Sequence, residues 1–233
     1  MANLILHIDT ATPVCSVALS RDGILVADCK AEKDNMHASN LTLLVEDLIT
    51  KVGVKLADLS AIAVSKGPGS YTGLRIGVST AKGLAYALDI PVIGIDALKS
   101  MAAGFSQQHG SNFASNVLLA PMIDARRMEV YMAVYNTALE LINDTAAVIM
   151  DEQTFDQLQT DHTIKLFGTG ANKLQALYEN NARVEIVTNF ESRASYMCEL
   201  ANARFQQQDF ESLAYFEPFY LKDFIPTTPK KLL

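Results

Sequence analysis

Three short apolar runs open the chain and alternate with turn-forming residues. The runs cover residues 4–8, 14–19 and 24–29, and the turns between them fall at residues 10–13 and at Asp22-Gly23. Strands joined by such short polar turns pair with their neighbours along the chain. The pattern therefore predicts an antiparallel meander of three strands at the start of the fold.

A helical pattern follows the meander. Apolar residues recur at spacings of three and four, namely at Leu41, Leu44, Val45, Leu48, Ile49 and Val52. This stripe is typical of an amphipathic helix that buries one face. The spacing does not say whether that face meets a sheet of the same chain or a partner.

From residue 61 onward, strands and helices alternate. Residues 61–64 form an apolar run that predicts a buried strand, and a helix follows from Tyr71, with Ser70 placed to cap it. Another strand is expected at residues 92–95, and Asp96 is placed to cap the next helix. This alternation indicates the α/β class.

The second half repeats this order more weakly. Strands are expected at residues 117–124, 129–135, 146–150, 164–168 and 184–187, and a long helix at residues 192–205. A meander followed by further strands and helices in each half predicts a duplicated fold. We place the domain boundary near residues 105–116, giving subdomains 1–105 and 106–233, and expect the last helix and an aromatic strap at residues 214–224 to pack back on the first subdomain.

The segment around the predicted helix cap is rich in glycine. Gly67 and Gly69 lie between a strand and a helix, where free backbone N–H groups attract phosphate. The loop is not a Walker A motif, because its lysine, Lys66, precedes the glycines.

Small residues then recur every fourth position within the helix. Gly73, Gly77 and Ala81 form a smooth stripe that another backbone can approach closely, and Leu74 and Val78 flank it. Glycine in a helix costs about 1 kcal/mol relative to alanine, so the stripe needs a packing reason. Packing on the chain's own sheet and contact with another protein both remain open from spacing alone.

Composition and charge narrow the function. The 233 residues are 49% hydrophobic and carry a formal net charge of −7, so no overall field draws the chain to nucleic acid. Arg126 and Arg127 are expected to be solvated surface. The three cysteines lack metal or disulfide spacing, no leader or membrane span is expected, and a reducing cytoplasm fits best.

Several motifs together resemble one family. The segments KGPGSYTGLRIGVSTAKGLA at 66–85, ILHIDTATPVCSVAL near the start, PMIDARRMEVYMAVY at 121–135 and EPFYL near the end are similar to those of TsaB, formerly YeaZ, a bacterial tRNA threonylcarbamoyladenosine biosynthesis protein. The resemblance implies two actin-like (ribonuclease H-like) subdomains, each a mixed sheet with an antiparallel meander and flanking helices.

The same resemblance bears on nucleotide and metal sites. In such folds an aspartate at a strand end contacts nucleotide phosphate, and Asp9 holds that position, with Lys66, Gly67 and Gly69 as further candidate contacts. The loop after Asp9 has no glycine, so autonomous ATP hydrolysis is not expected. The His-x-x-x-His metal pair of the related TsaD is absent, because Leu41 follows His37 at the fourth position. We expect no catalytic residue and no metal site.

The implied role is that of a non-catalytic scaffold. Members of the family pair directly with a TsaD homologue, which transfers threonylcarbamoyl to the adenosine beside the anticodon of tRNA, and the ATPase TsaE joins them. ATP or ADP, magnesium and the metal bound by TsaD are expected only in the assembled complex, and tRNA is contacted through it. A homodimer is expected for the isolated chain, and no membrane contact.

The resemblance also places the partner interface on the first two helices, at about residues 37–52 and 72–88. This favours an intermolecular role for the small-residue stripe. The expected interface residues are Leu41, Leu44, Val45, Leu48, Gly73, Leu74, Arg75, Gly77, Val78 and Ala81.

Two other functions are less compatible with the sequence than the scaffold role. A protease would need a base for a nucleophile such as Ser70, and no histidine is identifiable as that base. A small-molecule kinase on the same fold could use Asp9 and the loops at residues 66–69 and 168–170, but the loop after Asp9 lacks the glycine such a site needs.

Overall fold

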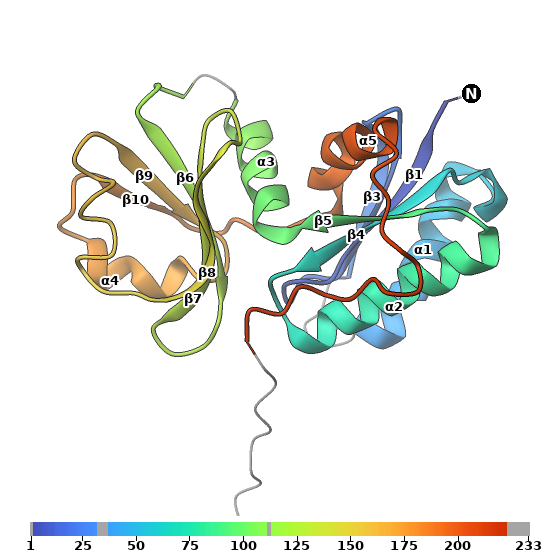
Figure 1. Ribbon diagram of the computed structural model, residues 1–233, viewed down its shortest axis with the longest axis horizontal. Helices are drawn as coiled ribbons and strands as arrows, with labels where there is room; N and C mark the ends of the chain where they lie inside the picture. The colour runs from blue at the N-terminus through green and yellow to red at the C-terminus, as the bar shows by residue number, and fades with distance from the viewer. Residues whose placement is uncertain (1, 32–36, 111–112, 223–233) are drawn as a thin grey trace, which may run out of the picture.

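The computed structural model describes residues 2–31, 37–110 and 113–222, and it contains two five-stranded mixed sheets (Figure 1). The first has the order β3-β2-β1-β4-β5. Its strands β1 (Leu4–Asp9), β2 (Ser16–Arg21) and β3 (Ile24–Lys30) form the predicted antiparallel meander. The strands β4 (Ala61–Gly67) and β5 (Val92–Asp96) extend the sheet in parallel with β1.

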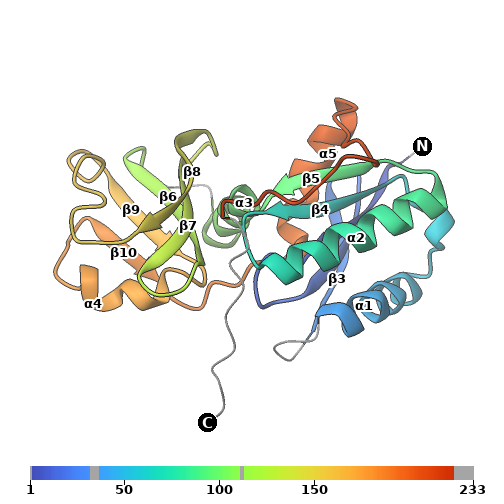
Figure 2. The same cartoon turned by 60° about the horizontal axis from the view of Figure 1, so that its bottom comes forward.

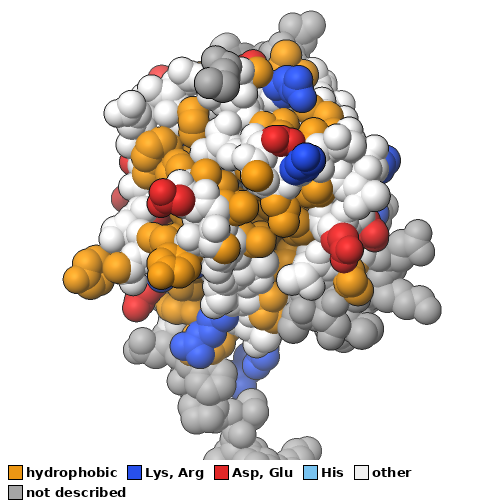
Figure 3. All heavy atoms as spheres, turned by 90° about the vertical axis from the view of Figure 1, so that its right-hand side faces the viewer, with side chains coloured by type: hydrophobic (Ala, Val, Ile, Leu, Met, Phe, Trp, Pro, Cys, Tyr) orange, Lys and Arg blue, Asp and Glu red, His pale blue; other side chains and the backbone are white. Residues whose placement is uncertain are grey.

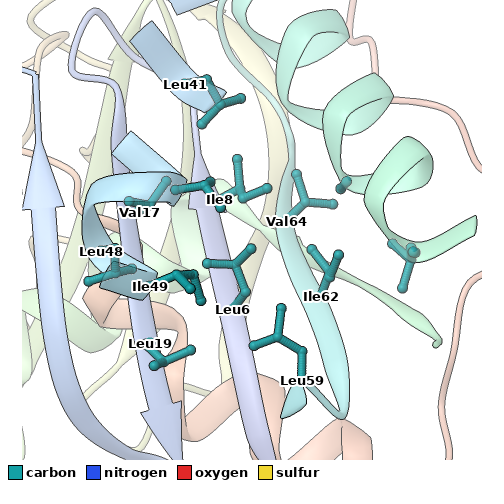
Figure 4. Packing of buried hydrophobic residues seen from close by; sticks show 14 of the residues in the cluster. Leu6, Ile8, Val17, Leu19, Leu41, Leu48, Ile49, Leu59, Ile62 and Val64 are labelled. Atoms are coloured by element: carbon teal, nitrogen blue, oxygen red, sulfur yellow. The ribbon is translucent and has the colours of Figure 1, made fainter. Parts of the chain in front are cut away.

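Two long helices cover one face of this sheet. Helices α1 (His37–Val52) and α2 (Tyr71–Leu88) lie side by side on it (Figure 2). Apolar side chains of the sheet pack against those of α1. Figure 4 shows Leu6, Ile8 and Val17 from the sheet next to Leu41 and Leu48 from α1. The alternation of side chains along β1 separates this core from a second one on the other face.

The other face of the first sheet is covered from the far end of the chain. The short 3-10 helix η3 (Ala194–Met197) and helix α5 (Cys198–Gln206) pack there against Ile5, Ala63 and Ile93. The sequence predicted one helix from residue 192, but regular α-helix begins only at Cys198. Ser192 does not cap it, because its hydroxyl donates to Asp9 instead.

The second sheet repeats the topology of the first. Its order is β10-β9-β6-β7-β8, with an antiparallel meander of β6 (Val117–Asp124), β7 (Glu129–Asn136) and β8 (Leu141–Ile149). Strands β9 (Thr163–Phe167) and β10 (Val184–Val187) run parallel to β6. The predicted duplicated α/β fold is therefore confirmed. The remaining short elements are η1 (Leu56–Asp58), η2 (Asn172–Leu174) and α4 (Gln175–Tyr178).

Helix α3 (Ala97–His109) lies between the two sheets (Figure 1). Asp96 caps it as predicted, since its carboxylate accepts a hydrogen bond of 2.8 Å from the Lys99 backbone N–H. Its apolar face joins a core that includes Leu74 from α2 and Leu119 from β6. The helix thus carries one continuous core from the first half of the molecule into the second.

Residues 211–222, here called the C-terminal strap, return along the first sheet and α2 (Figures 1 and 2). The Glu211 backbone N–H bonds the Val92 carbonyl at 2.9 Å, which covers the edge of β5. Phe216 is buried in the core beneath α2, and Lys82 donates to the Phe216 carbonyl at 3.0 Å. The strap is therefore an integral layer of the fold.

Candidate functional site

Asp9, the expected nucleotide-facing carboxylate, is buried at the end of β1 with 1% of its surface exposed. Its Oδ1 accepts a hydrogen bond from the Ala11 backbone N–H at 3.0 Å, and its Oδ2 accepts one from the Ser192 hydroxyl at 2.6 Å. The first bond shapes the turn after β1, and the second holds the segment that returns from the second sheet. Asp9 thus joins distant parts of the chain.

The glycine-rich loop lies next to this turn because β4 pairs with β1. The Ser70 backbone N–H donates to the Ala11 carbonyl at 2.7 Å, and a Cβ at Gly69 would come within 2.2 Å of that oxygen. The sequence predicted that free N–H groups at this helix start could bind phosphate. The Ser70 N–H is instead used in a hydrogen bond within the chain. Gly69 is required by this close approach of the Ala11 backbone.

The C-terminal strap closes the loop from another side. The Phe219 backbone N–H donates to the Lys66 carbonyl at 2.7 Å, and a Cβ at Gly67, whose φ is +114°, would lie 2.7 Å from the Phe219 carbonyl oxygen. The Lys66 ammonium lies 3.9 Å from the Glu211 carboxylate. Both glycines and the lysine of this candidate site therefore serve contacts within the chain.

The small-residue stripe of α2 packs against the same turn. A Cβ at Gly73 would lie 2.1 Å from the Thr10 carbonyl oxygen, and one at Gly77 would lie 2.3 Å from the Thr10 hydroxyl oxygen. That hydroxyl donates to the Gly73 carbonyl at 2.7 Å. The expectation that Gly73 and Gly77 make room for another protein is therefore wrong, because Thr10 of the same chain fills that room.

The apolar residues expected at the interface are also internal. They lie in the cores beneath α1 and α2, with at most 4% of their surface exposed for Leu41, Val45, Leu48, Leu74, Val78 and Ala81. Leu44 is partly buried against the same core. The six buried residues do not reach the surface where a partner could contact them, because the apolar stripe of each helix seals its own sheet, and an interface contact by the partly buried Leu44 stays a prediction.

Arg75 alone among the expected interface residues is exposed. Its guanidinium carbon lies 4.3 Å from the centre of the Tyr71 ring, and its Nε donates to the Tyr220 hydroxyl at 3.2 Å. This hydrogen bond raises the pKa of Arg75 above its usual value. Arg75 is thus a fixed positive charge beside an aromatic pair, at the junction of α2 and the C-terminal strap.

The face that α1 and α2 do present to solvent was missed by the sequence reasoning. We define the outer helical face as Leu43, Arg75, Ser79, Gly83 and Tyr86, all exposed. Leu43 is 55% exposed and Tyr86 80% exposed. Both are apolar residues off the buried stripe, which is the signal that could have identified them. The end-on view shows apolar side chains interspersed with charged ones on the side of the molecule that carries these helices (Figure 3).

Several reactive side chains make internal contacts, and His7, Cys15 and Cys198 are buried. His7 bonds the Ser20 hydroxyl through Nε2 at 2.7 Å, and burial lowers its pKa to about 3, so the ring is neutral at pH 7. Burial raises the pKa of Cys15 to about 11 and that of Cys198 to about 12. Ser70 Oγ accepts from the Gly73 backbone N–H as a helix cap. These groups serve the structure.

The described residues contain neither a candidate metal site nor a candidate membrane-spanning helix. Within residues 2–31, 37–110 and 113–222, no group of three His, Cys, Asp or Glu side chains is placed to hold a metal ion. No helix in those ranges has the length and hydrophobicity needed to cross a bilayer.

Structural comparison relates the chain to solved proteins of the same fold. The structure named YeaZ from Pseudomonas aeruginosa superposes with a TM-score of 0.81 at 27% sequence identity, covering 94% of this chain and 100% of that one. An activator of 2-hydroxyisocaproyl-CoA dehydratase from Clostridium difficile, solved with bound ADPNP, matches with a TM-score of 0.50 at 9% identity. The second likeness shows the actin-like fold alone.

Sequence comparison identifies the family. Residues 31–233 match the family model described as TsaD, tRNA N6-adenosine threonylcarbamoyltransferase. The tRNA threonylcarbamoyladenosine biosynthesis protein TsaB of Escherichia coli is 41% identical over 66% of each chain, and that of Haemophilus influenzae is 33% identical over 100% of this chain and 98% of its own. On these matches, the chain belongs to the TsaB (YeaZ) family of tRNA threonylcarbamoyladenosine biosynthesis proteins.

Proposed function

We propose that this chain is a non-catalytic subunit that supports threonylcarbamoyl transfer to tRNA by binding a TsaD homologue. Membership of the TsaB family gives the pathway. The observation that carries the scaffold role is the internal use of Asp9 and of the loop at residues 66–69, the positions where a catalytic relative would hold nucleotide. Because the chain itself occupies those positions, we assign the function to its outer surface, which would bind the TsaD homologue.

The outer helical face is the proposed contact with the TsaD homologue. It replaces the buried stripe as the interface on the same two helices. Leu43 and Tyr86 supply exposed apolar and aromatic area, and Ser79 and Gly83 keep the surface between them low enough for another helix to approach. Arg75 adds a charge at the rim.

The proposal includes the other expected components. ATP or ADP, magnesium and the metal held by TsaD would bind only in the assembled complex, which a TsaE homologue would join and through which tRNA would be contacted. The isolated chain would form a homodimer through the same outer helical face. The protein would act in the cytoplasm, because its tRNA substrate is found there.

Two charge-introducing variants test the interface. Leu43→Glu and Tyr86→Glu are expected to weaken co-purification with the TsaD homologue about tenfold or more, and to lower threonylcarbamoyl transfer to tRNA in proportion, because each buries a charge in the contact. Ile142→Glu is the matched control, since Ile142 is 46% exposed on β8 of the other sheet.

The outcomes separate clearly. Full binding and transfer by both helix variants would exclude this face. Equal losses in the control would show that the effect is not specific to it. If the wild-type chain neither binds the homologue nor affects transfer, the scaffold role itself is wrong.

A further inference from the structure

The tip of the β6–β7 hairpin, residues 124–129, places two arginines in an unusual backbone conformation. Arg126 has φ +75° and Arg127 φ +50°, in the left-handed region that glycine and asparagine occupy most readily. The turn is closed by hydrogen bonds of 3.1 Å from Ala125 N–H to the Glu129 carbonyl and from Glu129 N–H to the Arg126 carbonyl.

The carboxylates at the hairpin tip are already paired with lysines. Lys173 forms an ion pair with Asp124 and also donates to the Glu129 carbonyl at 2.7 Å, which ties the two strands together. Lys222 of the C-terminal strap forms an ion pair with the Glu129 carboxylate. Both acidic groups nearby are therefore neutralised, and the hairpin is braced on two sides.

The two arginines are left without such a partner. Both are exposed, and in the described part of the chain neither guanidinium makes an ion pair or a ring contact. The tip therefore presents two unpaired positive charges on a chain whose formal net charge is −7. Exposed arginine pairs on a rigid turn suit phosphate, because each guanidinium donates two parallel hydrogen bonds to its oxygens.

We propose that the hairpin tip binds the phosphate backbone of the substrate tRNA through Arg126 and Arg127. This rests on the proposed function, because a subunit of a tRNA-modifying complex meets that polyanion during each reaction. The acidic remainder of the chain repels RNA, so the tip sets both where the RNA touches this subunit and how strongly the contact depends on salt. Phosphate contacts of this kind position the RNA without reading its sequence.

The first test reverses the charge at the tip. Arg126→Glu/Arg127→Glu is compared with Arg21→Glu/Arg183→Glu, a control with the same charge change at two other exposed arginines that have no ion pair among the described residues. Fluorescence anisotropy measures affinity for an unmodified tRNA transcript, using the full chain in complex with its TsaD homologue. We expect roughly tenfold weaker binding and a shallower salt dependence, by about one unit of slope per arginine, for the tip variant.

The second test separates binding from the shape of the turn. Arg126→Asn/Arg127→Gly removes both charges and supplies residues that suit the left-handed backbone. We expect a melting temperature equal to or above that of the wild type, together with weakened tRNA binding. Wild-type tRNA affinity in this variant, or in the charge reversal, would overturn the proposal.

Co-purification with the TsaD homologue keeps the two proposals apart. If the wild-type chain forms no complex, the proposed function fails, and the same variants are then compared for RNA binding by the chain alone. If the tip variants lose the TsaD homologue while the isolated chain keeps its RNA affinity, the hairpin is a contact for an acidic protein surface, and the tRNA proposal is wrong.

Discussion

Gly73 shows how one missing side chain fixes the turn after β1. Its Cα faces the Thr10 carbonyl so closely that a Cβ would lie 2.1 Å from the oxygen, and the Thr10 hydroxyl bonds the Gly73 carbonyl. The same turn places the Ala11 carbonyl where it accepts the Ser70 backbone N–H and lies against Gly69. The tertiary contact thus offsets the cost of placing a glycine within the helix.

The matched pair Gly73→Ala and Gly83→Ala tests this assignment. Gly73→Ala is expected to destabilise the chain by about 1–3 kcal/mol through overpacking against backbone that cannot move freely. Gly83 has nothing within 4 Å of its Cβ position, so Gly83→Ala is expected to stabilise by up to about 1 kcal/mol through helix propensity alone. Urea unfolding of both variants measures the difference, and a stable Gly73→Ala would contradict the close packing.

Sequence reasoning found these glycines but not their neighbour. The spacing of Gly73 and Gly77 predicted a close backbone approach, and the structure shows one at Gly73, whereas at Gly77 the Thr10 side chain fills the space. The approaching backbone belongs to Thr10, 63 residues earlier in the chain. A periodicity within one helix carries no information about which distant segment lies above it, so the partner's identity could not be predicted.

At the scale of elements, the C-terminal strap is a structural layer with few regular hydrogen bonds. The aromatic, proline-marked composition of residues 214–224 predicted that it packs back on the fold, but gave neither its path along α2 nor the insertion of Phe216. Strands and helices were easier to predict because their apolar periods are local. The outer helical face was missed because Leu43 and Tyr86 lie outside any period.

Phe216 and Tyr215 allow the strap to be tested with adjacent residues. Phe216 is 7% exposed and Tyr215 86% exposed. Phe216→Ala is expected to cost about 3–5 kcal/mol, because it leaves a cavity beneath α2. Tyr215→Ala is expected to change stability by less than about 0.5 kcal/mol. Thermal unfolding compares them, and equal melting temperatures would show that the strap is not part of the cooperative unit.

At the scale of the whole molecule, the two sheets are joined by chain segments that run between them. Helix α3 carries the core across, with the Phe105 and Phe167 rings stacked at 4.1 Å between centres. The return segment places Ser192 against Asp9, and Lys222 of the strap reaches Glu129 on β7. The duplication was predictable from the repeated order of elements, whereas these connections join residues with no shared pattern.

Ser192→Ala tests the junction between the two sheets. The variant removes the hydroxyl that bonds the buried Asp9 carboxylate, so we expect a loss of about 1–3 kcal/mol in the free energy of unfolding. Ser195→Ala is the control, because its half-buried hydroxyl makes no bond that the structure records. Chemical denaturation provides the comparison. Equal stability of the two variants would mean that the Asp9–Ser192 bond contributes nothing to the junction.

The bridge between Glu211 and Val92 also has a consequence for biosynthesis. The first sheet is formed by residues 4–96, yet the residue that pairs with the edge of β5, Glu211, comes much later in the chain. On the ribosome, that edge therefore stays open while more than a hundred further residues are added. Unpaired strand edges invite pairing with other chains. We therefore expect the first sheet to be exposed to such pairing until the segment around Glu211 has been synthesised.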